Sequence, residues 1–188
     1  MGRPKMLLPW GESSVLGHLI NLWSRVLEEQ IVVVCADGDA GVENELNRLG
    51  VPKENRVVNP QPERGMFSSV QCAAQWRGWR STLTHWTIAL GDQPQLQLAT
   101  LQTLADFARE HPAKICQPGQ AGHGRHPIIF PRNDFQSLAQ SKAHTLKEFL
   151  EARSADVQLI EVDDPGLDVD LDEPADYESA LKTFRAGH

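Results

Sequence analysis

One carboxylate stands directly behind a strongly apolar stretch, in the sequence IALGDQP. The segment 84–92 is typical of a buried strand, and Asp92 stands at its carboxyl end. In open α/β sheets, ligands bind beyond the carboxyl ends of the strands. A carboxylate there is a hard oxygen ligand that suits Mg²⁺ bridging phosphates. The same residues would also serve as a turn or as the N-cap of a helix over 97–111, so the strand alone leaves both interpretations open.

A second acidic cluster lies near the end of the chain, in LDVDLDEPADY. Asp168, Asp170 and Asp172 alternate there, so in an extended segment their side chains point the same way. Like charges on one face repel one another unless a cation lies between them. The alternative is a solvated edge followed by a helix that begins at Pro174, and taken alone the segment favours it.

Two further segments could contact an anion. The opening residues place Gly2, Arg3 and Lys5 ahead of an apolar MLL, either as a dispensable leader or as part of a binding loop. The proline-bounded segment 59–70 runs into a predicted helix at Gly65. Backbone amides at such a helix start, with serine hydroxyls nearby, suit a phosphate or a ribose, although an ordinary capped helix would look the same. In the glycine-rich segment 119–127, two histidines suggest zinc only weakly, because no third ligand has suitable spacing.

Composition limits the kind of protein this is. The 188 residues carry a net charge of −7, which argues against a nucleic-acid surface but not against small anions. The three cysteines are far apart, so neither a disulfide framework nor a Cys-x-x-Cys metal site is indicated. The longest clean apolar stretch, 31–36, is too short to cross a bilayer. We therefore expect a soluble, cytoplasmic protein with one domain over residues 1–188 and no nucleic-acid or membrane partner.

The elements that must position these residues alternate between strand and helix. This alternation predicts a three-layer, Rossmann-like α/β sandwich with a mostly parallel sheet. The chain enters on a loop and a helix, with no strand before them. The expected strands are 31–36, 55–60, 84–92, 113–118, 126–132 and 157–162, and the expected helices are 13–29, 40–50, 66–79, 97–111, 133–140, 144–153 and 174–185.

The order of the short motifs resembles that of the MobA-like nucleotidyltransferases, most closely the molybdenum cofactor cytidylyltransferases. The resemblance covers nearly the whole chain, and its most specific parts are the Gly-Asp-Gln-Pro element and the acidic motif near the end. It implies a fold similar to that of the nucleotide-diphospho-sugar transferases. The motifs are Met1-Gly2-x-x-Lys5 with Leu7-Leu8, Gly65-Met66-x-x-Ser69, Gly91-Asp92-Gln93-Pro94, His126-Pro127 and Asp170-x-Asp172-x-Pro174-x-Asp176.

The resemblance also implies a reaction and a site. A nucleotidyl group, CMP in preference to GMP, would pass from an NTP to a phosphorylated acceptor of the molybdopterin type, with release of pyrophosphate. Mg²⁺ would assist, and positioning and charge neutralisation would provide most of the catalysis. The implied roles are triphosphate contact and catalysis for Lys5, nucleotide binding for Gly2, Arg3, Gly65, Met66 and Ser69, metal binding for Asp92 (also catalytic) and Asp170, and acceptor binding for Arg125 and His126.

The chain departs from the family pattern at three places. Members begin with a strand and a Leu-Ala-Ala-Gly-x-Ser-x-Arg loop, which are absent ahead of Met1, so we expect an N-terminally truncated domain. Arg125 replaces the glycine usual before His-Pro, and Glu173 replaces the threonine usual before Pro174. A second hypothesis is therefore a non-catalytic nucleotide- or cofactor-binding module that serves a molybdenum hydroxylase.

Overall fold

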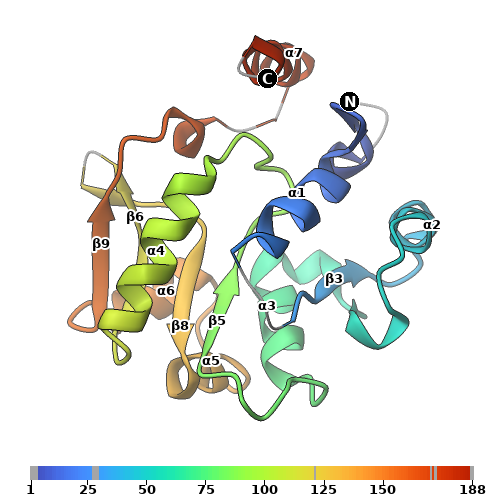
Figure 1. Cartoon of the computed structure of the whole chain (residues 1–188). Coiled ribbons are helices and arrows are strands. Elements are labelled where there is room, and N and C mark those ends of the chain that lie inside the picture. The colour runs from blue at the N-terminus through green and yellow to red at the C-terminus, as the bar shows by residue number, and fades with distance from the viewer. Residues whose placement is uncertain (1–3, 27–29, 121, 170, 172, 187–188) are drawn as a thin grey trace.

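A mixed sheet forms the centre of the molecule, with helices on both faces (Figure 1). The computed structural model describes residues 4–26, 30–120, 122–169, 171 and 173–186. In the sheet, β8 runs antiparallel to both neighbours, β5 and β6, while β9 runs parallel to β6. The α/β fold class expected from the sequence is confirmed. The strands are β5 (His85–Ile88), β8 (Ile128–Pro131), β6 (Ile115–Gln120), β7 (His123–Gly124) and β9 (Val157–Glu161).

Two further strands form a separate parallel pair, β3 (Val33–Ala36) with β4 (Arg56–Asn59). In Figure 1 they lie on the α2 side of β5. Among the described residues, β3 and β4 pair only with each other. The strands expected from the sequence are therefore present in two separate sheets, a parallel pair and a larger mixed sheet.

The helices alternate with the strands as expected, but most are shorter. The predicted helix 66–79 ends at Gln75, because Trp76 is extended and its ring packs closely over Gly78. Gly50 follows α2 with a positive φ of 69°, the conformation that ends helices at glycine. The helices are α1 (Val15–Ser24), α2 (Ala40–Arg48), α3 (Met66–Gln75), α4 (Leu98–Glu110), α5 (Arg132–Leu138), α6 (Leu146–Glu151) and α7 (Pro174–Ala186).

Side chains of β8 point alternately to the two faces of the sheet, and each face carries a hydrophobic core. Ile128 and Phe130 point to one face, where α3, α5 and α6 pack around Phe149. Ile129 points to the opposite face and meets α4 through Leu104. Both faces of the strand are thus apolar and buried, as expected of a strand with helices on both sides.

The chain reaches this core by way of a short 3₁₀ turn, η1 (Lys5–Leu7), and a small hairpin of β1 (Pro9–Trp10) and β2 (Ser13–Ser14). Met6 and Leu7 of the turn pack against a buried cluster of residues from α1 and α2. The backbone bearing Lys5 is therefore anchored by apolar contacts rather than left as a loose terminus.

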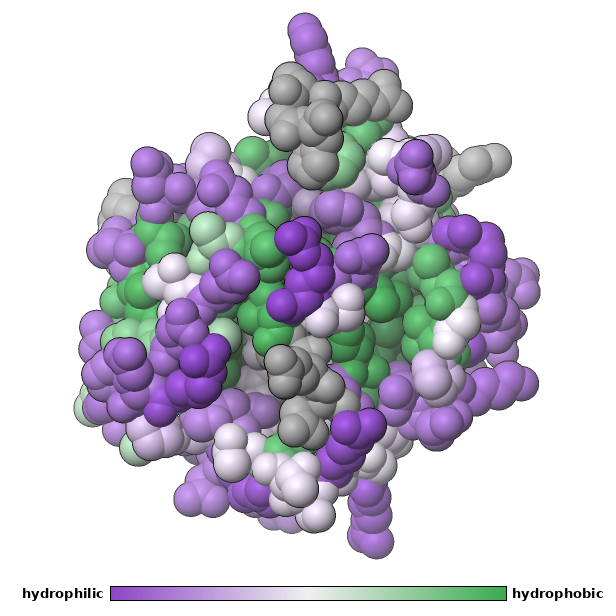
Figure 2. All heavy atoms as spheres, in the orientation of Figure 1, coloured by the Kyte–Doolittle hydropathy of each residue, from purple (hydrophilic) through white to green (hydrophobic). Residues whose placement is uncertain are grey.

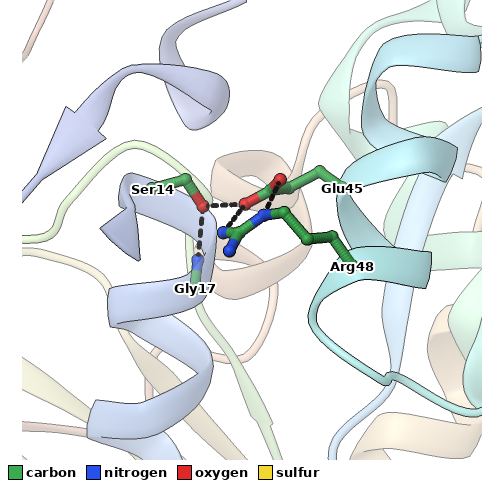
Figure 3. Close-up of polar contacts among 4 residues, drawn as sticks. All are labelled: Ser14, Gly17, Glu45 and Arg48. Carbon is green, nitrogen blue, oxygen red and sulfur yellow. Dashed lines mark hydrogen bonds and ion pairs between the residues drawn. The ribbon is translucent and has the colours of Figure 1, made fainter. Parts of the chain in front are cut away.

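A polar contact also joins the start of α1 to α2 (Figure 3). The Ser14 hydroxyl donates to the Glu45 carboxylate and accepts a 3.0 Å hydrogen bond from the Gly17 amide. Arg48 donates to both oxygens of Glu45 at 2.8 and 2.6 Å. Because Arg48 and Ser14 stabilise the carboxylate form against the effect of burial, the pKa of Glu45 is lowered.

Polar side chains cover most of the face that carries α1 and α4, with apolar side chains grouped between them (Figure 2). None of the helices in the described ranges combines the length and apolar character needed to cross a bilayer.

Candidate active site

Lys5 and Asp92 lie together although 86 residues separate them in the sequence. Strand β5 ends at Ile88, and the following turn presents Asp92 beyond the carboxyl end of the strand. The Lys5 Nζ lies 3.8 Å from the Asp92 Oδ2, with the two side chains 29% and 39% exposed. Both groups are therefore open to a ligand, and the structure brings together the two residues for which the sequence predicted catalytic roles.

The donor set at Asp92 can be compared with what Mg²⁺ requires. No group of three or more His, Cys, Asp or Glu side chains that could hold a metal occurs within the described part of the chain. Mg²⁺ is usually held by one or two carboxylates, with substrate phosphates and water completing the octahedron. The partly exposed carboxylate of Asp92 fits that role. Asp170, the second predicted ligand, lies outside the described residues, as do Gly2 and Arg3.

His126 lies beside the same turn. Its Nδ1 is 3.4 Å from the carbonyl oxygen of Ile88, the last residue of β5, and the His126–Pro127 peptide bond is cis. Burial lowers the pKa of His126, with the Ile88 carbonyl and the Asp92 carboxylate acting in the opposite direction. The imidazole is therefore neutral near pH 7 and offers both a donor and an acceptor nitrogen.

Arg125 joins the loop before β8 to the acidic segment. Its Nε donates to Oδ1 of Asp168 at 2.9 Å, and its Nη2 lies 2.8 Å from the same oxygen in an ion pair. Asp168 ends the 3₁₀ turn η4 (Pro165–Asp168), and its side chain is 47% exposed. The ion pair thus brings the predicted acceptor residue Arg125 to the segment that precedes Asp170.

The third predicted loop lies at the start of α3, after β4. Gly65 has a φ of 84°, the left-handed region that favours glycine, and Met66 is 47% exposed. Ser69 belongs to the first turn of the helix. The backbone amides of this turn form a helix N-terminus with a positive partial charge, suited to an anion.

Asn59 arranges this loop, although it was not among the residues predicted for the site. It is 1% exposed at the end of β4. Its Nδ2 donates to the hydroxyls of Ser68 and Ser69 at 2.8 and 2.9 Å, and its Oδ1 accepts from the Gln61 amide at 2.9 Å. The signal in the sequence that could have identified Asn59 is an Asn at the carboxyl end of a predicted strand, ahead of two serines on the next predicted helix.

Comparison with known proteins places the chain in a family. The profile of the MobA-like NTP transferase domain matches residues 1–157. A molybdenum cofactor guanylyltransferase of Mesorhizobium japonicum is 31% identical over 130 residues, which are 68% of this chain and 58% of that protein. The chain thus matches less than two thirds of that relative's length.

Solved structures extend the comparison over the whole fold. The Mycobacterium tuberculosis protein Rv0371c in complex with manganese has a TM-score of 0.68 and 26% identity, with 96% of this chain and 93% of that chain covered. A nucleotidyl transferase from Methanothermobacter has a TM-score of 0.79 at 18% identity, covering 98% of this chain and 86% of that one, and shares the fold.

Proposed function

The chain belongs to the MobA-like NTP transferase domain family, and we propose that it transfers a nucleotidyl group from an NTP to a phosphorylated acceptor of the molybdopterin type. The observation that carries this proposal is the exposed pair of Lys5 and Asp92, 3.8 Å apart beyond the end of β5. A cation and a carboxylate in that place suit a triphosphate and the metal ion that accompanies it.

In the proposed reaction, a phosphate oxygen of the acceptor attacks the α-phosphorus of the NTP. The new P–O bond forms as the bond from the α-phosphorus to the oxygen bridging to the β-phosphorus breaks, and pyrophosphate leaves with that electron pair. Lys5 neutralises charge on the triphosphate. No covalent bond to the protein is needed, so the side chains act by binding, orienting and compensating charge.

Asp92, together with Asp170, would hold Mg²⁺, which supplies further neutralisation of the phosphate charge when it is bound. The manganese in the mycobacterial structure supports a divalent metal in this fold. The start of α3, with Gly65, Met66 and Ser69, would contact the nucleotide, and so would Gly2 and Arg3.

Arg125 and His126 would bind the acceptor. The guanidinium of Arg125 suits a phosphate, and the neutral imidazole of His126 suits a polar group of the acceptor. We propose CTP as the preferred nucleotide on the basis of the Gly-Asp-Gln-Pro and Asp-x-Asp motifs. GTP is the competing candidate, because the relative from Mesorhizobium japonicum is named a guanylyltransferase.

The test is an incubation of the protein with Mg²⁺, molybdopterin and either CTP or GTP. Pyrophosphate release and a molybdopterin dinucleotide seen by mass spectrometry would support the proposal, and the better nucleotide identifies the specificity. Nucleotide binding by calorimetry without any turnover would instead support the binding-module hypothesis. If the protein neither binds nor turns over any NTP, both the transferase and the binding-module hypotheses are rejected.

A further inference from the structure

Asp164 is a buried carboxylate that the proposed reaction does not use. It is 1% exposed, and both of its oxygens accept hydrogen bonds. Oδ2 accepts from the Gln97 amide at 2.9 Å and from the Thr100 hydroxyl at 2.8 Å, and Oδ1 accepts from the Gly166 amide at 2.9 Å. A carboxylate removed from water is stable only when its oxygens are satisfied in this way.

These hydrogen bonds join two distant parts of the chain. Gln97 is the N-cap residue of α4, but its own side chain does not cap the helix. Asp164, 67 residues later, provides the acceptor and the negative charge that a helix N-terminus favours. The start of α4 is therefore fixed to the beginning of η4.

Gln95 strengthens the same junction from the other side. Its Nε2 donates to the carbonyl oxygens of Gly166 and Val169 at 3.1 and 2.6 Å. Gly166 permits this approach because a Cβ atom there would lie 2.6 Å from the Gln95 carbonyl oxygen. The two backbones thus touch at a point where only glycine fits without a shift.

Both segments lead to the carboxylates of the proposed metal site. Asp92 lies three residues before Gln95, and Val169 lies between Asp168 and Asp170. We infer that Asp164 and Gln95 are positioning residues, which hold residues 164–169 against the segment that follows Asp92 and so set the affinity of the site for a divalent metal. Since both oxygens of Asp164 are occupied and enclosed, this residue acts through position and does not itself bind the metal. The inference rests on the proposed function.

Three variants test it. Asp164→Asn places an amide NH₂ against backbone donors, Gln95→Met removes both donated hydrogen bonds at similar volume, and Gly166→Ala forces the two backbones apart. The control is Thr145→Ala, which removes the N-cap of α6, where the Thr145 hydroxyl accepts from the Glu148 amide at 3.1 Å. It lowers stability through a comparable loss of a cap but leaves the junction intact.

The main readout is Mn²⁺ binding in the presence of CTP or GTP, followed by electron paramagnetic resonance, with the melting temperature recorded for each variant. We expect the Mn²⁺ affinity to fall about 10-fold or more in the three junction variants, as for other residues that support metal ligands, and to stay unchanged in Thr145→Ala. Junction variants that bind Mn²⁺ as tightly as Thr145→Ala at equal melting temperature would overturn the inference.

A second readout does not depend on the proposed function. Amide hydrogen exchange should accelerate at Gln97 and Gly166 in Asp164→Asn and remain unchanged there in Thr145→Ala. If the unmodified protein binds no Mn²⁺ with any NTP, the proposed function fails and so does the metal-positioning role, while faster exchange would still identify the junction. Unchanged exchange in Asp164→Asn would show that Asp164 fixes nothing, whatever the protein binds.

Discussion

Asp92→Asn should separate the catalytic contribution of the site from its contribution to folding. The substitution removes the charge that faces Lys5 and replaces one of the two carboxylate oxygens proposed for the metal with an NH₂ group, with almost no change in side-chain volume. Simple Coulomb attraction at 3.8 Å, with an effective dielectric constant of about 20, would be about 4 kcal/mol. That value is an upper bound, because both side chains are partly exposed and solvent screens them.

Measured exposed ion pairs contribute about 1 kcal/mol or less, so we expect the free energy of unfolding of Asp92→Asn to change by no more than about 1 kcal/mol. Loss of a charge that stabilises a transition state has a larger effect, on the order of 100-fold or more in kcat. Urea unfolding and pyrophosphate release with saturating Mg²⁺ measure the two quantities in the same samples.

A matched control is Asp106→Asn. Asp106 pairs with Arg109 at 2.7 Å on α4, with 60% of the Asp106 side chain exposed, so the variant also loses one exposed carboxylate from an ion pair. It should retain activity within about 2-fold, as surface substitutions away from a site do. If Asp92→Asn is as active as Asp106→Asn, the role proposed for Asp92 is wrong. If Asp92→Asn fails to fold, the Lys5–Asp92 pair contributes more to stability than expected for a partly exposed ion pair.

Three further predictions concern pH and buried polar contacts. Burial lowers the pKa of both His126 and His85, so below about pH 6.5 the unfolded chain binds more protons than the folded protein, and stability should fall as the pH drops through that value. In His126→Gln the urea midpoint should fall less steeply with decreasing pH, because only the His85 contribution remains. The pKa of Glu45 is lowered chiefly by Arg48, so Glu45→Gln should cost about 1 kcal/mol at pH 7. The difference from the unmodified protein should disappear as the pH falls through the lowered pKa of Glu45 and the carboxylate is protonated. Asn59→Ala should cost about 2–3 kcal/mol in urea unfolding and raise KM for the NTP, whereas an unchanged KM would contradict its role in arranging the α3 loop.

Local patterns in the sequence predicted most of the elements and the turn that carries Asp92. Gly50 ends α2 through a backbone conformation that other residues avoid, and Ser14 caps α1 by a bond to an amide three residues ahead. These signals are local, so the sequence contains them directly. The position of Asp92 followed from one further rule, that the carboxyl ends of strands carry ligands.

The pairing of strands could not be predicted in the same way. The apolar stretch 31–36 indicates a buried strand but does not show which strand pairs with it. That β3 pairs with β4 and not with β5 is decided by backbone hydrogen bonds between residues distant in the sequence. Asp164 was missed for a related reason. Its Asp-Pro-Gly turn is visible in the sequence, but its burial depends on Thr100, 64 residues away, and an isolated Asp is ordinarily exposed.

The contacts that hold the site differ in kind from those that face a ligand. Met6 and Leu7 anchor the Lys5 turn in an apolar cluster, and Asp164 is enclosed with both of its carboxylate oxygens hydrogen-bonded. Lys5–Asp92 and Arg125–Asp168 are instead partly exposed ion pairs. Such pairs contribute little to stability, so a phosphate or a metal ion can take over each charge at small cost. The segments can therefore stay fixed while their charged ends exchange partners, as the proposed nucleotidyl transfer by positioning and charge compensation requires.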